Sequence, residues 1–248
     1  MSVILAARRA RAGRAGCSPD DVSAALAHAA AAAREAPSVV ATQPCRWWIG
    51  PDGAHLDADR GGRPGRDPDD RLLTISCGAA LHYATVALAA DGVGVKVVRL
   101  PSLVLPGRIA VLRYTGPAEP DPRAQRLRQA IGRRSRDRRP VGAEPVPGAQ
   151  LRLLRRAAAA AGASLYPLPA QATDRTGLAV IATVGVGPRD WLATGEAMSA
   201  VLLSAAAEGL ATGPVTALSA RVPTALTRLL PPGAGHPAAV VRFGVADR

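Results

Sequence analysis

The residues best suited to chemistry form a run of arginines interrupted by one hydroxyl, at positions 133–139 (Arg-Arg-Ser-Arg-Asp-Arg-Arg). Arginine keeps its charge and offers paired N–H donors that match a phosphate, and serine adds a donor with little bulk. If the run opened a helix, free backbone amides would strengthen its attraction for an anion. A solvated charged surface has the same composition, so both interpretations stay open for the run taken alone.

Two further segments could border the same ligand. Residues 37–46 form a proline-bounded loop between a predicted helix and a predicted strand, and such a loop can present backbone groups to a flat ligand. Residues 209–217 are glycine-rich and follow a predicted helix, so their amides could point at the edge of a ring. The three segments together suggest a pocket for a flat, anionic molecule.

Helices and a modest sheet must position these segments. Ser18 precedes Pro19 with Asp21 three residues on, which is the pattern of a helix-capping box. Apolar periodicity predicts helices at residues 20–36, 71–91, 123–132, 148–162, 189–208 and 223–230. Strands are predicted at 47–49, 54–58, 93–99, 108–114, 165–168, 178–183 and 237–243, the first two as a hairpin. The predicted fold class is therefore α+β.

The chain also carries an internal repeat. The arginine run has a weaker copy at residues 7–11, and each copy is followed by an alanine-rich helix. In a second pair of helices, Gly78, Ala80, Ala90 and Gly92 align with Gly195, Ala197, Ala207 and Gly209, and we matched the apolar run at 93–98 to that at 238–243. Alanine-rich helices can look alike by chance. Agreement of three segments in order favours two fused copies of one unit, with one surviving anion site.

Composition limits the classes of protein. The 248 residues suit one large domain or two small ones, and a hydrophobic content of 48% is ample for a core. The net charge is +12, but Lys96 is the only lysine, and arginine-rich, lysine-poor usage is typical of a GC-rich genome. Since no motif interleaves arginine with aromatic residues, we expect no nucleic-acid partner, while attraction to anionic ligands remains.

The cysteines and histidines give little indication of a metal or disulfide framework. Cys17, Cys45 and Cys77 are an odd, widely spaced set, which favours a reducing compartment. Cys77 lies at a predicted helix start, where a thiol can be activated, although a small buried residue is the simpler interpretation. The histidines show no metal-ligand spacing. We expect a cytoplasmic protein, because we find no secretory leader and no apolar run of about 20 residues.

At this point a resemblance becomes specific. Residues 36–46 resemble the A-P-S-x-x-N-x-Q-P-W loop of flavin-dependent nitroreductases, and Arg133-Arg134-Ser135 resembles their R-x-S anchor. More narrowly, the chain is similar to the Acg-type fused branch, in which two nitroreductase units share one polypeptide. The matching segments are residues 74–82, 133–140, 190–197 and 236–244, and the similarity covers nearly the whole chain.

The resemblance implies a nitroreductase-like α+β fold in which two fused half-units form an intramolecular pseudo-dimer. The units would be residues 1–116 and 123–248, joined by a linker at 117–122, in one compact body. One FMN would bind between them, with the loop from the first unit and the arginine segment from the second. The implied FMN-binding residues are Pro37, Ser38, Val39, Ala41, Arg133, Arg134, Ser135, Arg138, Pro214, Val215, Thr216 and Ala217. Residues 214–217 would face flavin N5, and either Arg133 or Arg134 would be the first anchor.

The chain departs from the family pattern in four places. Ala41 replaces the loop asparagine, which removes a side-chain hydrogen bond usually worth about 0.5–1.5 kcal/mol. Cys45 replaces the loop tryptophan, the region between Pro169 and Thr176 is short, and only residues 245–248 follow Gly244. In the second unit Leu165-Tyr166 replaces the Pro-Ser turn, so the resemblance implies one flavin per chain rather than two.

The function implied is that of an FMN-dependent oxidoreductase that passes hydride or electrons through flavin N5 to a small, possibly aromatic substrate. Either a reduced nicotinamide, NAD(P)H, or a partner would be the electron donor, and no side chain is an obvious general acid or base. Two alternatives stay open: a flavin-binding or sequestering protein, and a pseudoenzyme that has lost FMN and turnover. We expect no metal, no membrane and no nucleic acid, and either a monomeric pseudo-dimer or a homodimer.

Overall fold

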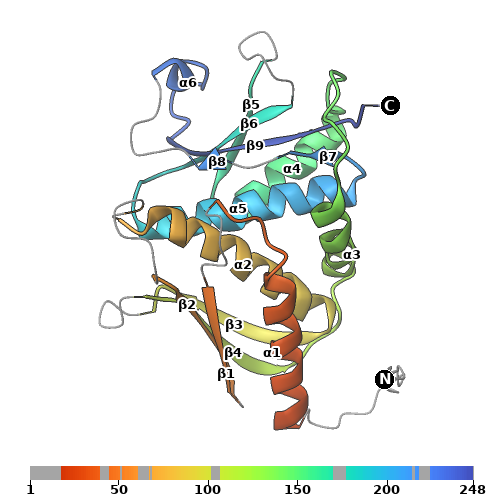
Figure 1. The fold of residues 1–248 in the computed structure, drawn as a ribbon, viewed down its shortest axis with the longest axis vertical. Coiled ribbons are helices and arrows are strands. Elements are labelled where there is room, and N and C mark those ends of the chain that lie inside the picture. The colour runs from red at the N-terminus through yellow and green to blue at the C-terminus, as the bar shows by residue number, and fades with distance from the viewer. Residues whose placement is uncertain are drawn as a thin grey trace.

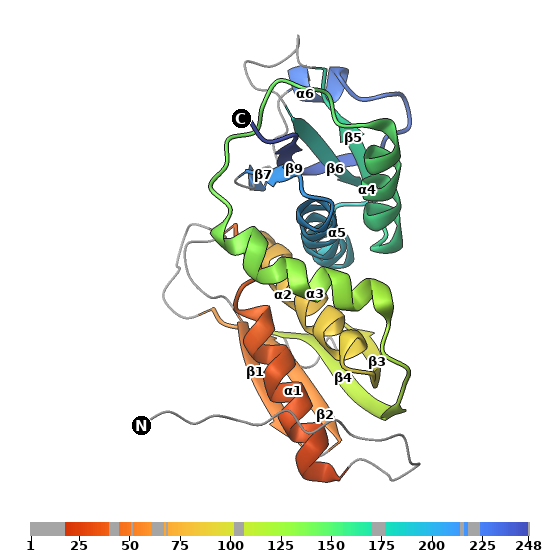
Figure 2. The ribbon, with the colours of Figure 1, turned by 90° about the vertical axis from the view of Figure 1, so that its right-hand side faces the viewer.

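Two antiparallel sheets lie at opposite ends of the molecule, with helices between them (Figures 1 and 2). The computed structural model describes residues 18–39, 45–50, 52–60, 67, 69–101, 107–169, 177–213, 216–217 and 224–247. In this described part of the chain, the molecule has four layers: a sheet, two layers of helices, and a second sheet. The α+β class predicted from the sequence is confirmed.

The first half of the chain builds a four-stranded sheet covered on one face by two helices. Its elements are α1 (Pro19–Ala33), β1 (Cys45–Gly50), β2 (Gly53–Ala58), α2 (Arg71–Ala90), β3 (Val93–Arg99) and β4 (Arg108–Pro117). The predicted capping box is present, because Asp21 N–H donates to the Ser18 hydroxyl and the Asp21 carboxylate accepts from Ser18 N–H. The strand order is β1-β2-β4-β3, all antiparallel. Leu26, Leu56 and Leu81 are buried where the helices meet the sheet.

The second half repeats this plan. Its elements are α4 (Gly148–Ala160), β5 (Ser164–Pro167), β6 (Leu178–Thr183), α5 (Pro188–Ala207), β7 (Ala211–Thr212), β8 (Thr216–Ala217), α6 (Thr224–Arg228) and β9 (His236–Gly244). The strand order is β5-β6-β9-β7, with β8 also paired to β9. Leu154, Ile181 and Phe243 belong to a second buried cluster.

The two halves share one plan. In each, a helix, two strands and a second helix come first, and the sheet orders β1-β2-β4-β3 and β5-β6-β9-β7 are equivalent; the second half has β8 and α6 in addition, between β7 and β9. One predicted pairing is wrong: β9 takes the place of β4, not of β3, and the counterpart of β3 is β7. The pairing could not be predicted because β7 has only two residues, which is too short for an apolar run that would identify a strand.

Helices α2 and α5 cross at equivalent glycines in the centre of the molecule (Figure 1). A Cβ placed on Gly78 would lie 2.3 Å from the carbonyl oxygen of Leu192, and one on Gly195 would lie 1.8 Å from that of Ile75. The two contacts are therefore reciprocal. The aligned glycines that follow both helices are in the left-handed conformation typical of a helix end, since Gly92 has φ +71° and Gly209 has φ +79°.

Helix α3 (Pro122–Arg136) packs against both α2 and α5 (Figure 2). It extends beyond the predicted residues 123–132 and contains Arg133, Arg134 and Arg136 in its last turn. The run therefore closes a helix and does not open one, so the condition under which free amides would strengthen its attraction for an anion is not met. Arginine is a good helix former, and its charge is favourable at the negative end of the helix dipole. Any anion bound here must be held by side chains rather than by helix-start amides.

Helix α2 contradicts the expectation that no apolar run reaches about 20 residues. Serine, threonine and histidine interrupt its apolar residues but add no charge, so the helix is long and apolar enough to cross a membrane by length and composition. The relevant window is 78% buried inside the protein. That degree of burial is what the core helix of a folded domain shows.

Candidate functional site

A cleft lies where the end of α3 approaches β7 and β9, and it brings together two of the three predicted segments. Its volume is about 510 Å³. It is lined by Arg134, Ser135, Asp137, Arg138, Arg139, Pro140, Val141, Thr212, Gly213 and Arg242. The arginine run supplies one wall, and Thr212 and Gly213 of the glycine-rich segment supply part of the other.

The cleft is strongly basic. Four guanidinium groups face one carboxylate, and that carboxylate is already engaged: Asp137 accepts hydrogen bonds of 3.0 Å and 2.8 Å from Arg139 Nε and Nη2. These bonds lower the pKa of Asp137, so it stays ionised and holds Arg139 in place. The remaining guanidinium groups give the cleft a positive charge suited to a phosphate.

Arg134 links the end of α3 to the first half of the chain. Its Nε donates to the Tyr83 hydroxyl at 2.5 Å and its Nη2 donates to the Glu35 carbonyl at 2.7 Å. Burial raises the pKa of Tyr83 to about 12 although Arg134 acts in the opposite direction. Arg134 therefore joins α3 to α2 and to the segment that follows α1.

The two possible first anchors are placed differently. Arg134 and Ser135 line the 510 Å³ cleft, whereas Arg133 lines a neighbouring hollow of about 460 Å³ with Arg136, Arg139 and Gly209 among its walls. Arg138 lines the cleft and donates from Nη1 to the Ser135 carbonyl at 2.9 Å. The geometry thus favours Arg134 over Arg133 as the residue next to a ligand.

The described first residues of the predicted loop, residues 37–39, lie against α2. The Ser38 hydroxyl donates to Ser76 Oγ at 3.3 Å, and Val39 N–H donates to the same atom at 3.2 Å. Val39 also packs against the core of the second half. Pro37, Ser38 and Val39 are not among the residues that line the cleft, and Ala41 lies outside the described residues.

The glycine-rich segment is only partly described. Pro214 and Val215 lie outside the described residues, and Thr216 and Ala217 form β8, paired with Val240 and Ala239. Gly213 N–H donates to the Arg242 carbonyl at 2.8 Å. The backbone of this segment is therefore held against β9, on the side where the cleft lies.

Arg139 and Thr212 belong to the predicted segments 133–139 and 209–217, whereas Arg242 is a lining residue outside every predicted segment. A signal for Arg242 existed: it lies between buried Val241 and Phe243 in a strand, so alternation directs its side chain away from that core. The structure also shows why the second half offers no counterpart to the loop. Only residues 161–163 separate α4 from β5, whereas residues 34–44 separate α1 from β1.

A smaller cavity of about 320 Å³ lies among α2, α3, α4 and α5, and it contains a buried ion pair. Arg99 donates from Nε and Nη2 to the two carboxylate oxygens of Glu196, at 2.8 Å and 3.0 Å. The Glu196 side chain is only 8% exposed. Burial raises the pKa of Glu196 more than the Arg99 guanidinium lowers it.

Near the same cavity His82 and Ser199 join α2 to α5, with His82 Nδ1 2.9 Å from Ser199 Oγ. Burial, and secondarily the charge of Arg123, lowers the pKa of His82 to about 4. Unfolded His82 takes up a proton near pH 6.5 while the folded form does not, so stability falls as pH drops from about 6.5 towards 4. We expect a loss of about 1 kcal/mol between pH 6.5 and 5.5 from this group, measured by urea unfolding.

The control for this prediction compares two histidines. His82→Gln should remove that part of the pH dependence, whereas His28→Gln should leave it unchanged because His28 is exposed on α1. Equal pH profiles for His82→Gln and the unmodified protein would contradict the assignment.

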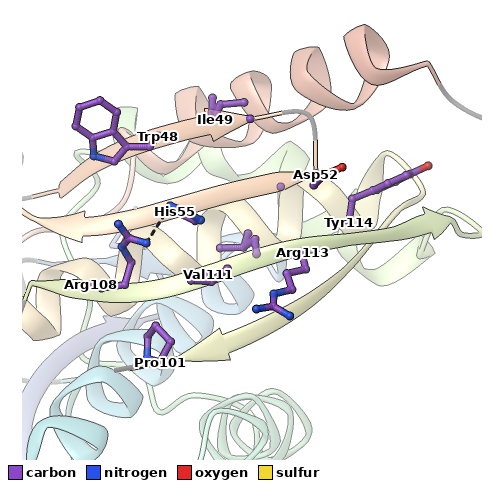
Figure 3. A pocket seen from close by; sticks show the side chains of 12 residues that line it. Trp48, Ile49, Asp52, His55, Pro101, Arg108, Val111, Arg113 and Tyr114 are labelled. Carbon is purple, nitrogen blue, oxygen red and sulfur yellow. Dashed lines mark hydrogen bonds between the residues drawn. The ribbon is translucent and has the colours of Figure 1, made fainter. Parts of the chain in front are cut away.

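The outer face of the first sheet forms a fourth concave surface, of about 710 Å³ (Figure 3). Trp48, His55, Arg108, Val111 and Arg113 line it, and Trp48 is 59% exposed. The sequence analysis saw no interleaving of arginine with aromatic residues, but strand pairing brings them together here. Arg108 is already engaged by Asp57 and by His55 Nδ1, and no predicted site residue lines this face.

Within the described part of the chain, no group of three or more His, Cys, Asp or Glu side chains is arranged to hold a metal ion. The chemistry of the cleft therefore has to be argued from its arginines and its serine.

Comparison with known proteins gives two relatives in Mycobacterium tuberculosis, from strains CDC 1551 and H37Rv, both named "Putative NAD(P)H nitroreductase". Each is 39% identical to this chain over 140 residues, which cover 54% of this chain and 39% of the relative. The chain thus matches about two-fifths of the length of these relatives. No protein-family model matches it.

Proposed function

We propose that the chain is an FMN-binding oxidoreductase of the nitroreductase type, with one flavin site per chain. The observation that carries the proposal is the basic cleft at the end of α3, where Arg134, Ser135, Arg138 and Arg242 converge. The names of the two relatives support the same class of activity and NAD(P)H as the electron donor. The substrate we propose is a small and possibly aromatic molecule.

The residues of the cleft fit the group. A volume of about 510 Å³ falls within the range of roughly 300–1,000 Å³ typical of ligand pockets. Arg134, Arg138 and Arg242 outnumber the single carboxylate, which is already paired with Arg139, so a doubly negative phosphate would find compensating charge. Ser135 would add a hydroxyl donor. When bound, FMN supplies hydride acceptance at N5, and the protein's part is to orient it and exclude competing reactions.

The first half would contribute through the segment that follows α1. Arg134 holds the Glu35 carbonyl, and Ser76 holds Ser38 and Val39, so this segment is fixed beside α3 and the second core. We propose that residues 37–41 and 214–217 complete the ring-binding part of the site around these anchors.

We further propose that residues 1–116 and 123–248 are two fused units, joined at 117–122, that form an intramolecular pseudo-dimer. The equivalent strand orders and the reciprocal contacts of Gly78 and Gly195 support this reading. Fusion would also account for a single site, because the short connection at 161–163 leaves the second half without a loop like that at 34–44.

The test is an absorbance spectrum of purified protein with and without added FMN, followed by titration of FMN binding. Arg138→Gln should weaken binding about tenfold or more, since a hydrogen bond to a charged group is worth about 1.5–3 kcal/mol. Arg133→Gln is the matched control: it removes the same charge from the same segment but outside the cleft, and should change affinity less than about threefold.

Each outcome separates the possible functions. Flavin absorbance that bleaches on addition of NADH or NADPH supports the oxidoreductase. Bound flavin that no nicotinamide reduces indicates a flavin-binding or sequestering protein. Protein that is colourless and ignores added FMN contradicts the proposal and favours a pseudoenzyme.

A further inference from the structure

Two cysteines that lie far apart in the sequence meet between the first sheet and α2. Cys45 is the first residue of β1 and Cys77 lies in the second turn of α2. Their sulfur atoms are 3.0 Å apart, and both are present as thiols. We propose that Cys45 and Cys77 are a redox-active pair that forms a reversible intramolecular disulfide.

The local structure explains why the two side chains converge. In β1 the alternation turns Cys45 and Trp47 towards the core, while Arg46 and Trp48 are exposed. Cys77 is completely buried on the face of α2 that packs against this sheet. Because a disulfide bond is about 2.05 Å long, the sulfur atoms need to approach by only about 1 Å from their 3.0 Å separation.

Burial sets the order of the chemistry. Cys45 is partly exposed and Cys77 is fully buried, so a hydroperoxide reaches Cys45 first. The Cys45 sulfur attacks the peroxide, the O–O bond breaks, and a sulfenic acid and one molecule of water or alcohol are formed. The Cys77 sulfur then attacks the sulfenic sulfur, the S–O bond breaks, and a second water leaves. Two thiols are oxidised and one hydroperoxide is reduced.

The disulfide would fix one segment of the chain at both of its ends. Ser76 already holds Ser38 and Val39, and Cys77 is the next residue on α2. Oxidation would therefore tie the chain on both sides of residues 40–44 to one turn of α2. The inference is independent of the proposed flavin site, because it needs no cofactor.

The experiment uses the full chain carrying Cys17→Ser, so that only the two cysteines of interest remain. After treatment with one equivalent of hydrogen peroxide and alkylation, trypsin digestion without reductant should join peptide 35–46 to peptide 72–96. The joined mass should be two hydrogen atoms below the sum of the two peptides, and a phosphine should separate them again. Alkylation of both thiols, or a bridge between two chains, would overturn the proposal.

Two variants test the order of the steps. In Cys77→Ala, Cys45 should accumulate a sulfenic acid that dimedone captures, whereas in Cys45→Ala the buried Cys77 should stay unmodified. Peroxide should raise the thermal midpoint of the Cys17→Ser protein by roughly 5–10 °C, through closure of the loop between residues 45 and 77, and leave both further variants unchanged. A sulfenic acid on Cys77 alone, or an equal thermal shift in either variant, would refute the assignment.

Discussion

A Gly195→Ala variant is expected to lose about 3 kcal/mol or more of unfolding free energy, which is the upper range for overpacking a closed core. The added Cβ would lie 1.8 Å from the carbonyl oxygen of Ile75 and 2.9 Å from the amide nitrogen of Ala79. Both atoms belong to the backbone of α2, so no side chain can rotate away and the two helices must separate. Urea unfolding followed by circular dichroism measures the loss.

Gly132→Ala is the matched control, because Gly132 is also a helical glycine. The nearest atom to its added Cβ is Arg136 Nη2 at 3.1 Å, the far end of a flexible side chain. Since alanine favours a helix over glycine by about 0.5–1 kcal/mol, this variant should be neutral or slightly stabilised. Gly78→Ala should resemble Gly195→Ala, since its Cβ would meet the Leu192 carbonyl at 2.3 Å. Equal stability of Gly195→Ala and Gly132→Ala would show that α2 and α5 are not packed this closely.

The crossing of α2 and α5 shows which part of the fold could be predicted from the sequence and which part could not. The alignment of Gly78 with Gly195 followed from a repeat of small residues, and the two helices prove to have equal extents, Arg71–Ala90 and Pro188–Ala207. A repeat establishes equivalence but says nothing about contact. That the equivalent glycines touch each other follows from the arrangement of the two halves, which no local pattern encodes.

Local signals predicted most of the elements, and their failures have local causes. The hairpin of β1 and β2, the capped α1 and the helix pair are where periodicity and turn residues placed them. The end of α3 was misjudged because an arginine-rich run carries no apolar periodicity. Helix α2 begins at Arg71, as the predicted range 71–91 has it, so Cys77 lies in its second turn and the thiol is in the core rather than at free amides.

The sequence predicted the kind of site, one for an anion, better than it predicted which residues lie together in it. The charge of the arginine run suggested an anion site, and the structure gathers Arg134, Ser135 and Arg138 in one cleft. Alternation in β9 directs Arg242 away from the core, but only the fold brings this strand, about a hundred residues later in the chain, to the end of α3. Nor could it show that Ser38 bonds to Ser76, because that contact depends on how the loop lies on α2.

The ion pair between Arg99 and Glu196 is another feature that only the folded chain reveals. Arg99 ends β3 in the first half, and Glu196 lies next to Gly195 on α5 in the second. Glu196 is buried at a position whose equivalent in α2 is Ala79. The pair therefore bridges the two halves beside the close crossing of α2 and α5, and we expect its loss to destabilise the contact between the halves.

Arg99→Ala is expected to cost about 2–3 kcal/mol of unfolding free energy at pH 7. Removing one partner of a fully buried pair costs about 3–5 kcal/mol, and the smaller figure allows for an Arg99 side chain that is 49% exposed. Burial already raises the pKa of Glu196, and removing Arg99 takes away the group that opposes this rise. A carboxyl whose folded pKa is raised is most costly above that pKa, so stability is lost as pH rises. Urea unfolding at pH 7 and at pH 4.5 should therefore show a smaller effect of the variant at the lower pH, because the raised pKa favours the neutral form of Glu196 as pH falls.

Two further variants separate charge from packing. Adding Glu196→Gln to Arg99→Ala should recover most of the loss at pH 7 and make the remainder independent of pH, because no buried charge is then left without its partner. Arg113→Ala removes an exposed arginine from the neighbouring strand β4 and should change stability by less than about 0.5 kcal/mol. If Arg99→Ala were equally destabilising at both pH values, the side chain would be acting through its packed methylene groups and not through the charge of Glu196.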